Sequence, residues 1–437
     1  MKVDTKKLSG GVSLGVINTD KFKNNYFSVN FVLPLTKENI SVCSVLASVL
    51  QRGTSKYPTS ALINRRLCML YDPNIDVSVT KLPRALVFRA TASFLDSSYL
   101  PSDGSNDVLF GLTEMIKDIL TDPVRENGVL STSYTESEKK RQIDRIRALI
   151  NNKDTFAYAR CEEIAYGDIP MSYSSRGTED EVNKVTPTVL SDKLDYILKK
   201  SPVEAIFAGN YTKKAEEAFE NMLWELFGNR DESALLTLPE MQKPSHCDGV
   251  REISEETDAK QGRMVLAYKM KGCLDNTAPT EVFTELFGAS PVSRLFMNVR
   301  ERLSLCYYCT SIQQYSAEMM FIRSGIEEKN REMAIAEIER QLDKLKNPSD
   351  ISDEELETAK KGISNAYRSL KDDAAHFAEW YALRKINLRI TDVDENVNAV
   401  LAVTKDDVAS VAREAEMKVS YFLCGKNKCS ERQGHKT

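Results

Sequence analysis

Histidine is scarce in this chain, since only His246, His376 and His435 occur among 437 residues. Their spacing supports neither a histidine zinc site nor a Ser-His-Asp triad. Long apolar runs are also missing: no stretch of about 18 apolar residues exists, so no transmembrane helix is expected. The N-terminal residues lack the apolar core of a signal peptide. We therefore expect a cytoplasmic protein with no membrane partner.

An excess of basic residues is absent as well. The formal net charge is -5, which argues against a nucleic-acid-binding surface. The apolar content of 42% and charged content of 28% are ordinary for a globular protein. At this length the chain is too long for one compact core and suits two to four domains.

Cysteine usage argues against a closed disulfide framework, because the nine cysteines are an odd number and most are scattered. Cys306 and Cys309 form a Cys-x-x-Cys within the strand-like run 303–312. Residues three apart on a regular strand point to opposite faces. The spacing therefore predicts neither a metal clip nor a redox pair.

The two halves of the sequence repeat one another with a period of roughly 220 residues, far longer than a solenoid repeat. Strand-like runs reach Gly209 in the first half and Gly425 in the second, and long charged helices are predicted over 135–152 and 352–370. This mixture predicts an α+β fold of two homologous domains, each a mostly antiparallel sheet with helices packed on one side. We place the domains at 1–228 and 256–437, joined by a polar linker at 229–255.

A helix is predicted over 38–50 from an apolar stripe at i, i+3, i+4, i+7 and i+8. The stripe consists of Val42, Val45, Leu46, Val49 and Leu50. Ser44 and Ser48 fall on the other side, one helical turn apart. Taken by periodicity alone, this side is a small, polar, solvated helix face.

The residues after this helix read Gln51-Arg52-Gly53-Thr54-Ser55-Lys56-Tyr57-Pro58. This run resembles the tail that follows the inverted zinc motif, His-x-x-Glu-His, in peptidases of the insulinase/pitrilysin family. In that register Ser44 and Ser48 stand in place of the two histidines, and Ala47 stands in place of the glutamate. Serine is a poor zinc ligand, and alanine cannot activate a water molecule.

The family's third zinc ligand is a glutamate on the long helix of the first domain. The matching acid positions here carry Lys140 and Arg147, while a one-turn slip brings Asp144 or Glu138 closer. A cation at a ligand position repels zinc. The resemblance therefore implies a chain without metal or other cofactor, with zinc only in a partner.

A second family motif is retained in the other half, as Ser293-Arg294-Leu295-Phe296-Met297-Asn298-Val299-Arg300-Glu301 followed by Leu303-Ser304-Leu305-Cys306-Tyr307-Tyr308. In the family, an arginine and a tyrosine seven residues later reach the substrate beside the zinc, and Arg300 and Tyr307 have that spacing. Ser304 departs from the family's glycine, so the turn is expected to differ slightly. Without the resemblance, Arg300 reads as a surface ion-pair partner of Glu301 and Tyr307 as one aromatic of a half-buried strand.

The resemblance covers nearly the whole chain and implies half of a clamshell that closes around a peptide. Within the family, the chain is similar to the bacterial YfmF-like branch, described as associated with aminopentanol modification of elongation factor P. We favour a non-catalytic subunit that supplies Arg300 and Tyr307 in trans to a homologous subunit with an intact His-x-x-Glu-His. Two alternatives remain: a purely structural or peptide-binding scaffold, and a self-sufficient metallopeptidase with unrecognised ligands.

Overall fold

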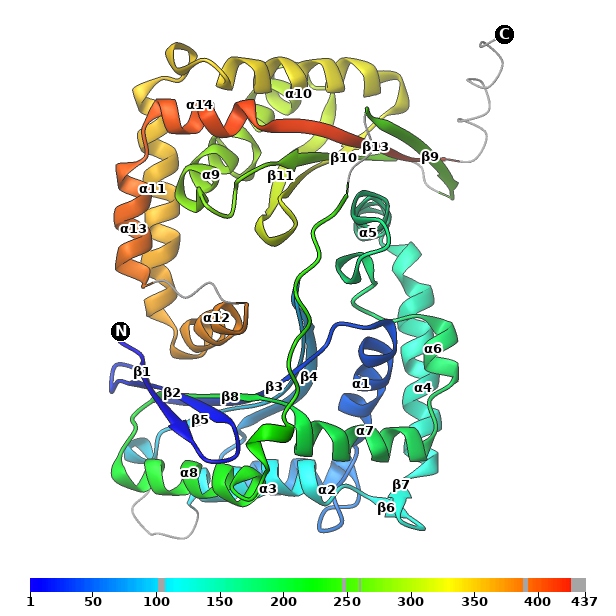
Figure 1. Cartoon of the computed structure of the whole chain (residues 1–437), viewed down its shortest axis with the longest axis vertical. Helices are drawn as coiled ribbons and strands as arrows, with labels where there is room; N and C mark the ends of the chain where they lie inside the picture. The colour runs from blue at the N-terminus through cyan, green and yellow to red at the C-terminus, as the bar shows by residue number, and fades with distance from the viewer. Residues whose placement is uncertain (101–106, 246–248, 259–260, 388–391, 426–437) are drawn as a thin grey trace. The chain divides into compact units, whose positions relative to one another are not determined.

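The computed structural model of the chain describes residues 1–100, 107–245, 249–258, 261–387 and 392–425 (Figure 1). The chain forms two compact units. Unit 1 consists of Met1–Arg147, Tyr173–Met241 and Leu370–Ile390, and unit 2 of Ala148–Ser172, Gln242–Ser369 and Thr391–Thr437. Each unit thus includes one segment from the opposite half of the sequence. The domain boundaries at residues 228 and 256 were drawn from the sequence repeat and remain a prediction.

Both units are built on a largely antiparallel sheet. The sheet of unit 1 has the order β1-β2-β8-β3-β5-β4, and only its β2–β8 pair is parallel. The sheet of unit 2 has the order β11-β12-β10-β13-β9, and only its β13–β9 pair is parallel. Read from β4 to β2 and from β11 to β9, the two orders correspond strand for strand. The α+β prediction is confirmed.

The strands of unit 1 are β1 (Asp4–Leu8), β2 (Val12–Asn18), β3 (Asn24–Leu33), β4 (Asn74–Lys81), β5 (Leu86–Leu95) and β8 (Val203–Gly209), with a short hairpin of β6 (Arg125–Glu126) and β7 (Val129–Leu130). Its helices are α1 (Lys37–Leu50), α2 (Ser60–Met69), α3 (Val108–Thr121), α4 (Thr132–Arg147), α6 (Glu179–Asn183), α7 (Pro187–Lys200), α8 (Lys213–Phe227) and α12 (Ala374–Ile386). Figure 1 shows α3, α7 and α8 along one face of the sheet and α12 on the other.

The strands of unit 2 are β9 (Arg251–Thr257), β10 (Gly262–Met270), β11 (Cys306–Gln314), β12 (Met319–Ile326) and β13 (Ala415–Gly425). Its helices are α5 (Lys153–Tyr166), α9 (Thr277–Thr284), α10 (Arg331–Leu345), α11 (Asp353–Ser369), α13 (Val393–Ala402) and α14 (Lys405–Arg413), with π-helical turns at Glu285–Ala289 and Phe296–Arg302. Strand β9 begins inside the stretch predicted as a linker. It is polar because it lies at the edge of the sheet, where only alternate side chains face the core.

The exchanged segments explain why central strands are buried on both faces. On β3, Phe31 packs in the main core of unit 1, while Val32 points to the other face and packs with Ile386 of α12. In unit 2, α5 contributes Ala157 and Cys161 to a core with Val265 of β10. Each sheet therefore has helices on one face and one exchanged helix on the other. Within the described ranges, no helix has the length and apolar character needed to cross a bilayer.

Candidate functional site

The first candidate region is the face of α1 that carries Ser44 and Ser48. Helix α1 begins after Thr36, whose side-chain oxygen accepts a hydrogen bond from the backbone N–H of Asn39 at 3.0 Å. From residue 41 to residue 50, only Ser44 and Ser48 are partly exposed. Their hydroxyls donate to the helix itself, Ser44 to the carbonyl of Ile40 at 2.7 Å and Ser48 to the carbonyl of Ser44 at 3.3 Å.

The remaining motif position, Ala47, is buried and brings no ionisable group to this face. Among the described residues, no group of three His, Cys, Asp or Glu side chains is arranged to hold a metal ion. The α1 face therefore presents two hydroxyls already bonded to backbone carbonyls, above the buried Ala47. None of these groups can activate a water molecule in the way the family's glutamate does.

Helix α4 packs against α1 and buries an acid there. The acid is Glu138, which is only 2% exposed and lies 3.4 Å from a guanidinium nitrogen of Arg52 and 3.0 Å from one of Arg141. Arg52 follows Ser48 by one helical turn, and its guanidinium lies over the ring of Tyr134, 5.2 Å from the centroid. The negative charge on this side of α4 is thus neutralised by arginines of the chain itself.

Sequence reasoning named Glu138 only as an alternative and did not single out Arg52. The four-residue spacing of Ser44, Ser48 and Arg52 was the available signal. Arg147 lies on the exposed side of α4, where it makes a two-pronged ion pair with Glu179 at 2.7–3.1 Å. Lys140 is exposed as well.

The second candidate region is the segment 293–308 of unit 2. Leu295 and Val299 are fully buried and fix one side of its helix. The helix widens into a π-helical turn, Phe296–Arg302, closed by a hydrogen bond from the N–H of Leu303 to the carbonyl of Asn298 at 3.2 Å. Such π-helical turns often occur at functional sites, because they shift the direction of the side chains that follow.

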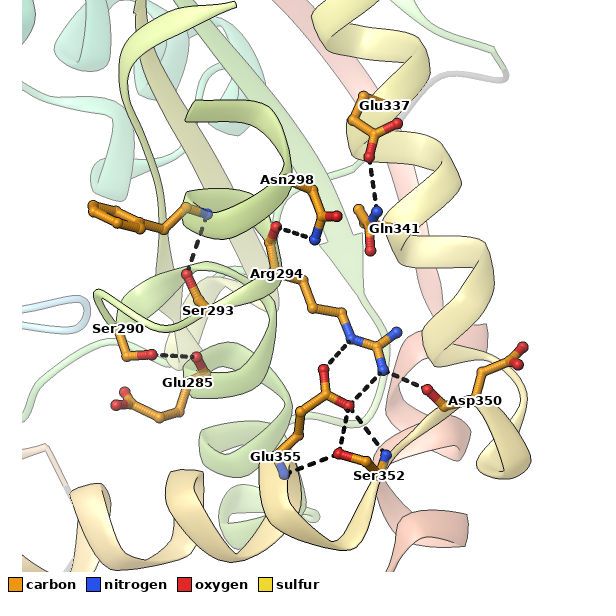
Figure 2. Close-up of polar contacts among 11 residues, drawn as sticks. Glu285, Ser290, Ser293, Arg294, Asn298, Glu337, Gln341, Asp350, Ser352 and Glu355 are labelled. Carbon is orange, nitrogen blue, oxygen red and sulfur yellow. Dashed lines mark hydrogen bonds and ion pairs between the residues drawn. The ribbon is translucent and has the colours of Figure 1, made fainter. Parts of the chain in front are cut away.

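An ion pair between a buried arginine and a partly exposed glutamate anchors this helix to the start of α11 (Figure 2). Arg294, only 7% exposed, donates from Nε and Nη2 to the carboxylate of Glu355 at 3.0 and 3.1 Å. The same Nη2 donates to the carbonyl of Asp350 at 2.6 Å. Ser352 and Glu355 also bond reciprocally as a capping box for α11.

The pKa of Glu355 reflects this anchor. Burial would raise the pKa of its carboxyl, but the hydrogen bonds from Arg294 and Ser352 outweigh burial and hold the pKa below its ordinary value. Glu355 is therefore ionised near neutral pH, and Arg294 is committed to a structural role. The sequence did not reveal this role, because the partner lies 61 residues away along the chain.

The turn between the helix and β11 contains Ser304 in a left-handed conformation, with φ of +48°. A residue with a Cβ atom adopts this conformation at a cost of about 1 kcal/mol, whereas glycine adopts it freely. Serine stands here in place of the family's glycine, and the sequence predicted that the turn would differ slightly. Ser304 takes up the left-handed conformation that suits a glycine.

Arg300 and Tyr307 lie on either side of this turn. The guanidinium carbon of Arg300 is 4.5 Å from the centroid of the Phe296 ring, and its Nε is 3.5 Å from Glu301. The ion pair with Glu301 is exposed on both sides and is therefore weak. Tyr307 is 65% exposed, which makes it more exposed than a half-buried strand residue.

Tyr307 owes its exposure to a β-bulge in β11. Cys306 pairs with Ile326, but Tyr308 pairs with Gly325, so Tyr307 is the extra residue and has no opposite partner on β12. Its neighbour Tyr308 points inward, and its hydroxyl donates to Asp154 of α5. The sequence predicted that Cys306 and Cys309 point to opposite faces of the sheet. This prediction is wrong, because the bulge turns both side chains to the same face.

The outer side of this segment is apolar as well as charged. Four exposed large apolar side chains occur within 16 residues of sequence, namely Val292, Met297, Leu303 and Tyr307. The segment can thus offer a cationic guanidinium, a phenol hydroxyl and apolar contact surface to another molecule.

Three comparisons with known proteins agree with this architecture. The family model "Peptidase M16 inactive domain" matches residues 184–363. The chain is 26% identical to the "Probable inactive metalloprotease YmfF" of Bacillus subtilis over 97% of this chain and 98% of that protein.

Solved structures show the same fold. A conserved protein from Enterococcus faecalis has a TM-score of 0.87 at 23% identity, over 98% of this chain and 99% of its own. A protease from Helicobacter pylori has a TM-score of 0.79 at 15% identity, over 97% of this chain and 99% of its own. A peptidase M16 inactive domain from Pseudomonas fluorescens has a TM-score of 0.79 at 13% identity, over 98% and 99%.

Proposed function

This chain is a homologue of the insulinase/pitrilysin (M16) peptidases whose zinc-motif positions carry Ser44, Ala47 and Ser48, and on that premise we propose that it is the zinc-free subunit of a two-component peptidase. Its partner is a homologous subunit with an intact His-x-x-Glu-His motif, which holds the zinc. This chain contributes Arg300 and Tyr307 to that partner's reaction centre and forms part of the surface that receives a peptide.

The observation that carries the proposal is the geometry of the segment 293–308. The Arg294–Glu355 ion pair, a left-handed serine and a bulge surround Arg300 and Tyr307, which both lie at the surface. Ordinary packing of a helix against a strand requires neither the left-handed serine nor the exposed tyrosine. Their presence in a chain whose zinc-motif positions carry no metal ligand supports a role in presenting these two side chains to another molecule.

The chemistry of the pair fits peptide hydrolysis. When water attacks a peptide carbonyl, negative charge develops on the carbonyl oxygen. A planar guanidinium and a neutral phenol hydroxyl can both donate hydrogen bonds to that oxyanion. The nucleophilic water and the Lewis acid belong to the zinc-bearing partner, and this chain supplies no group that replaces them.

The proposal predicts that activity requires both subunits. The isolated chain should bind no stoichiometric zinc and cleave no unstructured peptide. Addition of a zinc-bearing homologue from the same cell should yield a complex with one zinc per pair and chelator-sensitive peptidase activity above that of the homologue alone. The measurement is a titration of one subunit into the other, followed by metal analysis of the purified complex.

Two outcomes would contradict the proposal. Tight zinc at one per isolated chain with peptidase activity would support the self-sufficient metallopeptidase. Formation of a stable complex without any gain in turnover would support the scaffold. The proposed cytoplasmic location is tested separately, by fractionation of cells that express the native protein.

A further inference from the structure

The register of β11 against β12 brings two thiols together. Cys306 pairs with Ile326 and Cys309 pairs with Ser324. Ile326 and Ser324 are two residues apart on β12, so their side chains lie on the same face, and their partners on β11 share that face. Residues two apart on a strand, such as Ile326 and Ser324, have Cα atoms about 6.8 Å apart, and this span is close to the upper limit that a disulfide between their partners could bridge.

The two thiols differ in reactivity. Cys309 is buried, whereas Cys306 is partly exposed. Interaction with the neighbouring Cys309 thiol lowers the pKa of Cys306 despite partial burial, and the positive charge of Arg300 acts in the same direction. The pKa of Cys309 is raised by the same interaction and by burial. Cys306 is therefore suited to attack an oxidant, and Cys309 is suited to react afterwards with the oxidised Cys306.

We propose that Cys306 and Cys309 form a reversible dithiol–disulfide site, oxidised by a small peroxide and reduced by cellular thiols. The Cys306 thiolate attacks one oxygen of the peroxide and breaks the O–O bond, which gives a sulfenic acid on Cys306 and, with one proton, releases water or an alcohol. The Cys309 thiol then attacks the sulfenic sulfur, the S–S bond forms and a second water leaves. Two thiol equivalents from a reductant restore both cysteines.

Other cysteines of the chain provide internal references. Cys43 and Cys161 are fully buried, and burial raises the pKa of both thiols, that of Cys43 to about 12. They are therefore poor nucleophiles near neutral pH. Cys68 is exposed on α2 and shows how an accessible cysteine reacts. The dithiol on β11 combines a partly exposed cysteine, the positive charge of Arg300 and a second cysteine on the same face.

The site has a consequence for the neighbouring tyrosine. A disulfide between Cys306 and Cys309 closes a ring that contains Tyr307 and Tyr308. The bulge that exposes Tyr307 lies inside this ring. Oxidation should therefore change the orientation of Tyr307. An effect of this change on a partner subunit rests on the proposed function. The dithiol chemistry itself needs no partner.

The test uses the full-length chain alone, so its result is independent of any peptidase partner. Trypsin releases residues 303–323 as one peptide, which contains Cys306, Cys309 and no other cysteine. After treatment with one equivalent of hydrogen peroxide, we expect this peptide to lose two hydrogen atoms, and dithiothreitol should reverse the change. Oxidation of Met319 or Met320 in the same peptide adds oxygen and is distinguished by mass.

Two variants complete the experiment. Cys306→Ser should abolish the loss of hydrogen, whereas Cys309→Ser should leave a sulfenic acid on Cys306 that reacts with dimedone. Both variants should retain the bulge, because serine is close to cysteine in size, and near-ultraviolet circular dichroism checks their fold. The proposal is overturned if the wild-type peptide stays reduced while Cys68 is oxidised, or if it gains oxygen without ever losing the two hydrogens.

Discussion

The polar side chains of helix α1 and of the segment 293–308 differ in whether they are bonded within the chain or left at the surface. On α1, the hydroxyls of Ser44 and Ser48 bond to their own helix, and the nearby Glu138 is neutralised by arginines. In the segment 293–308, one arginine is buried as an anchor, while Arg300 and Tyr307 remain at the surface. The α1 helix thus packs without any metal-binding side chain on its partly exposed side, whereas Arg300 and Tyr307 are exposed next to a specific anchor, turn and bulge.

The largest stability effect that separates the two regions should come from Arg294→Met. The change leaves the Glu355 carboxylate without its two-pronged partner, a loss that costs about 3–5 kcal/mol for a fully buried pair. Because the Glu355 side chain is 37% exposed, we expect about 2–3 kcal/mol. Urea unfolding measures the loss. A matched variant, Arg302→Met, removes a mostly exposed arginine of the same helix and should change stability by less than about 0.5 kcal/mol.

The same anchor predicts a dependence on pH. The pKa of Glu355 is lowered in the folded chain, so its ionisation stabilises the fold above the ordinary glutamate pKa. This contribution is lost as the pH falls through the lowered folded-state value. The stability difference between wild type and Glu355→Gln should therefore be constant from about pH 6 to pH 8 and shrink below about pH 4.5. A difference that grows on acidification would contradict the assignment.

A smaller effect is expected on the α1 side from Arg52→Met. Glu138 is more deeply buried than Glu355, but it keeps its contact with Arg141. We therefore expect a loss of about 1–2 kcal/mol. In a double-mutant cycle, Arg52→Met should cost much less stability in the Glu138→Gln background than in the wild type, because the buried negative charge is then absent. Additive effects in the cycle would show that Arg52 does not neutralise Glu138.

The smallest effects concern Ser304 and the α1 serines. Ser304→Gly should stabilise the chain by about 0.5–1 kcal/mol, because relief of the left-handed strain exceeds the added entropy of the unfolded state. Ser304→Ala keeps the Cβ atom and should give no such gain. Ser44→Ala and Ser48→Ala should each change stability by less than about 0.5 kcal/mol. Thermal unfolding of the four variants compares them directly.

Local patterns in the sequence were enough for much of the fold. The apolar stripe predicted a helix at 38–50, and the structure has α1 at Lys37–Leu50. The strands that reach Gly209 and Gly425 are β8 and β13. The exchange of α5 and α12 was not predictable in this way, because it depends on which sheet face each amphipathic helix covers.

The same division holds for the candidate site. Motif spacing identified Arg300 and Tyr307, but nothing local indicated the bulge that exposes Tyr307 and aligns the two cysteines. The bulge is defined only by pairing with β12. The partners of Arg294 and Arg52 were equally hidden, since each ion pair joins residues distant in sequence.

The central claim is that this chain donates Tyr307 to a partner's reaction centre. The most direct measurement is kcat of the reconstituted two-subunit peptidase with Tyr307→Phe, at equal assembly with wild type. Tyr99→Phe, which changes another exposed tyrosine, is the matched control. We predict that Tyr307→Phe lowers kcat by about 10²–10³, as loss of one oxyanion donor does, and that the control has no effect. An unchanged kcat in Tyr307→Phe would contradict the claim and leave this chain as a scaffold.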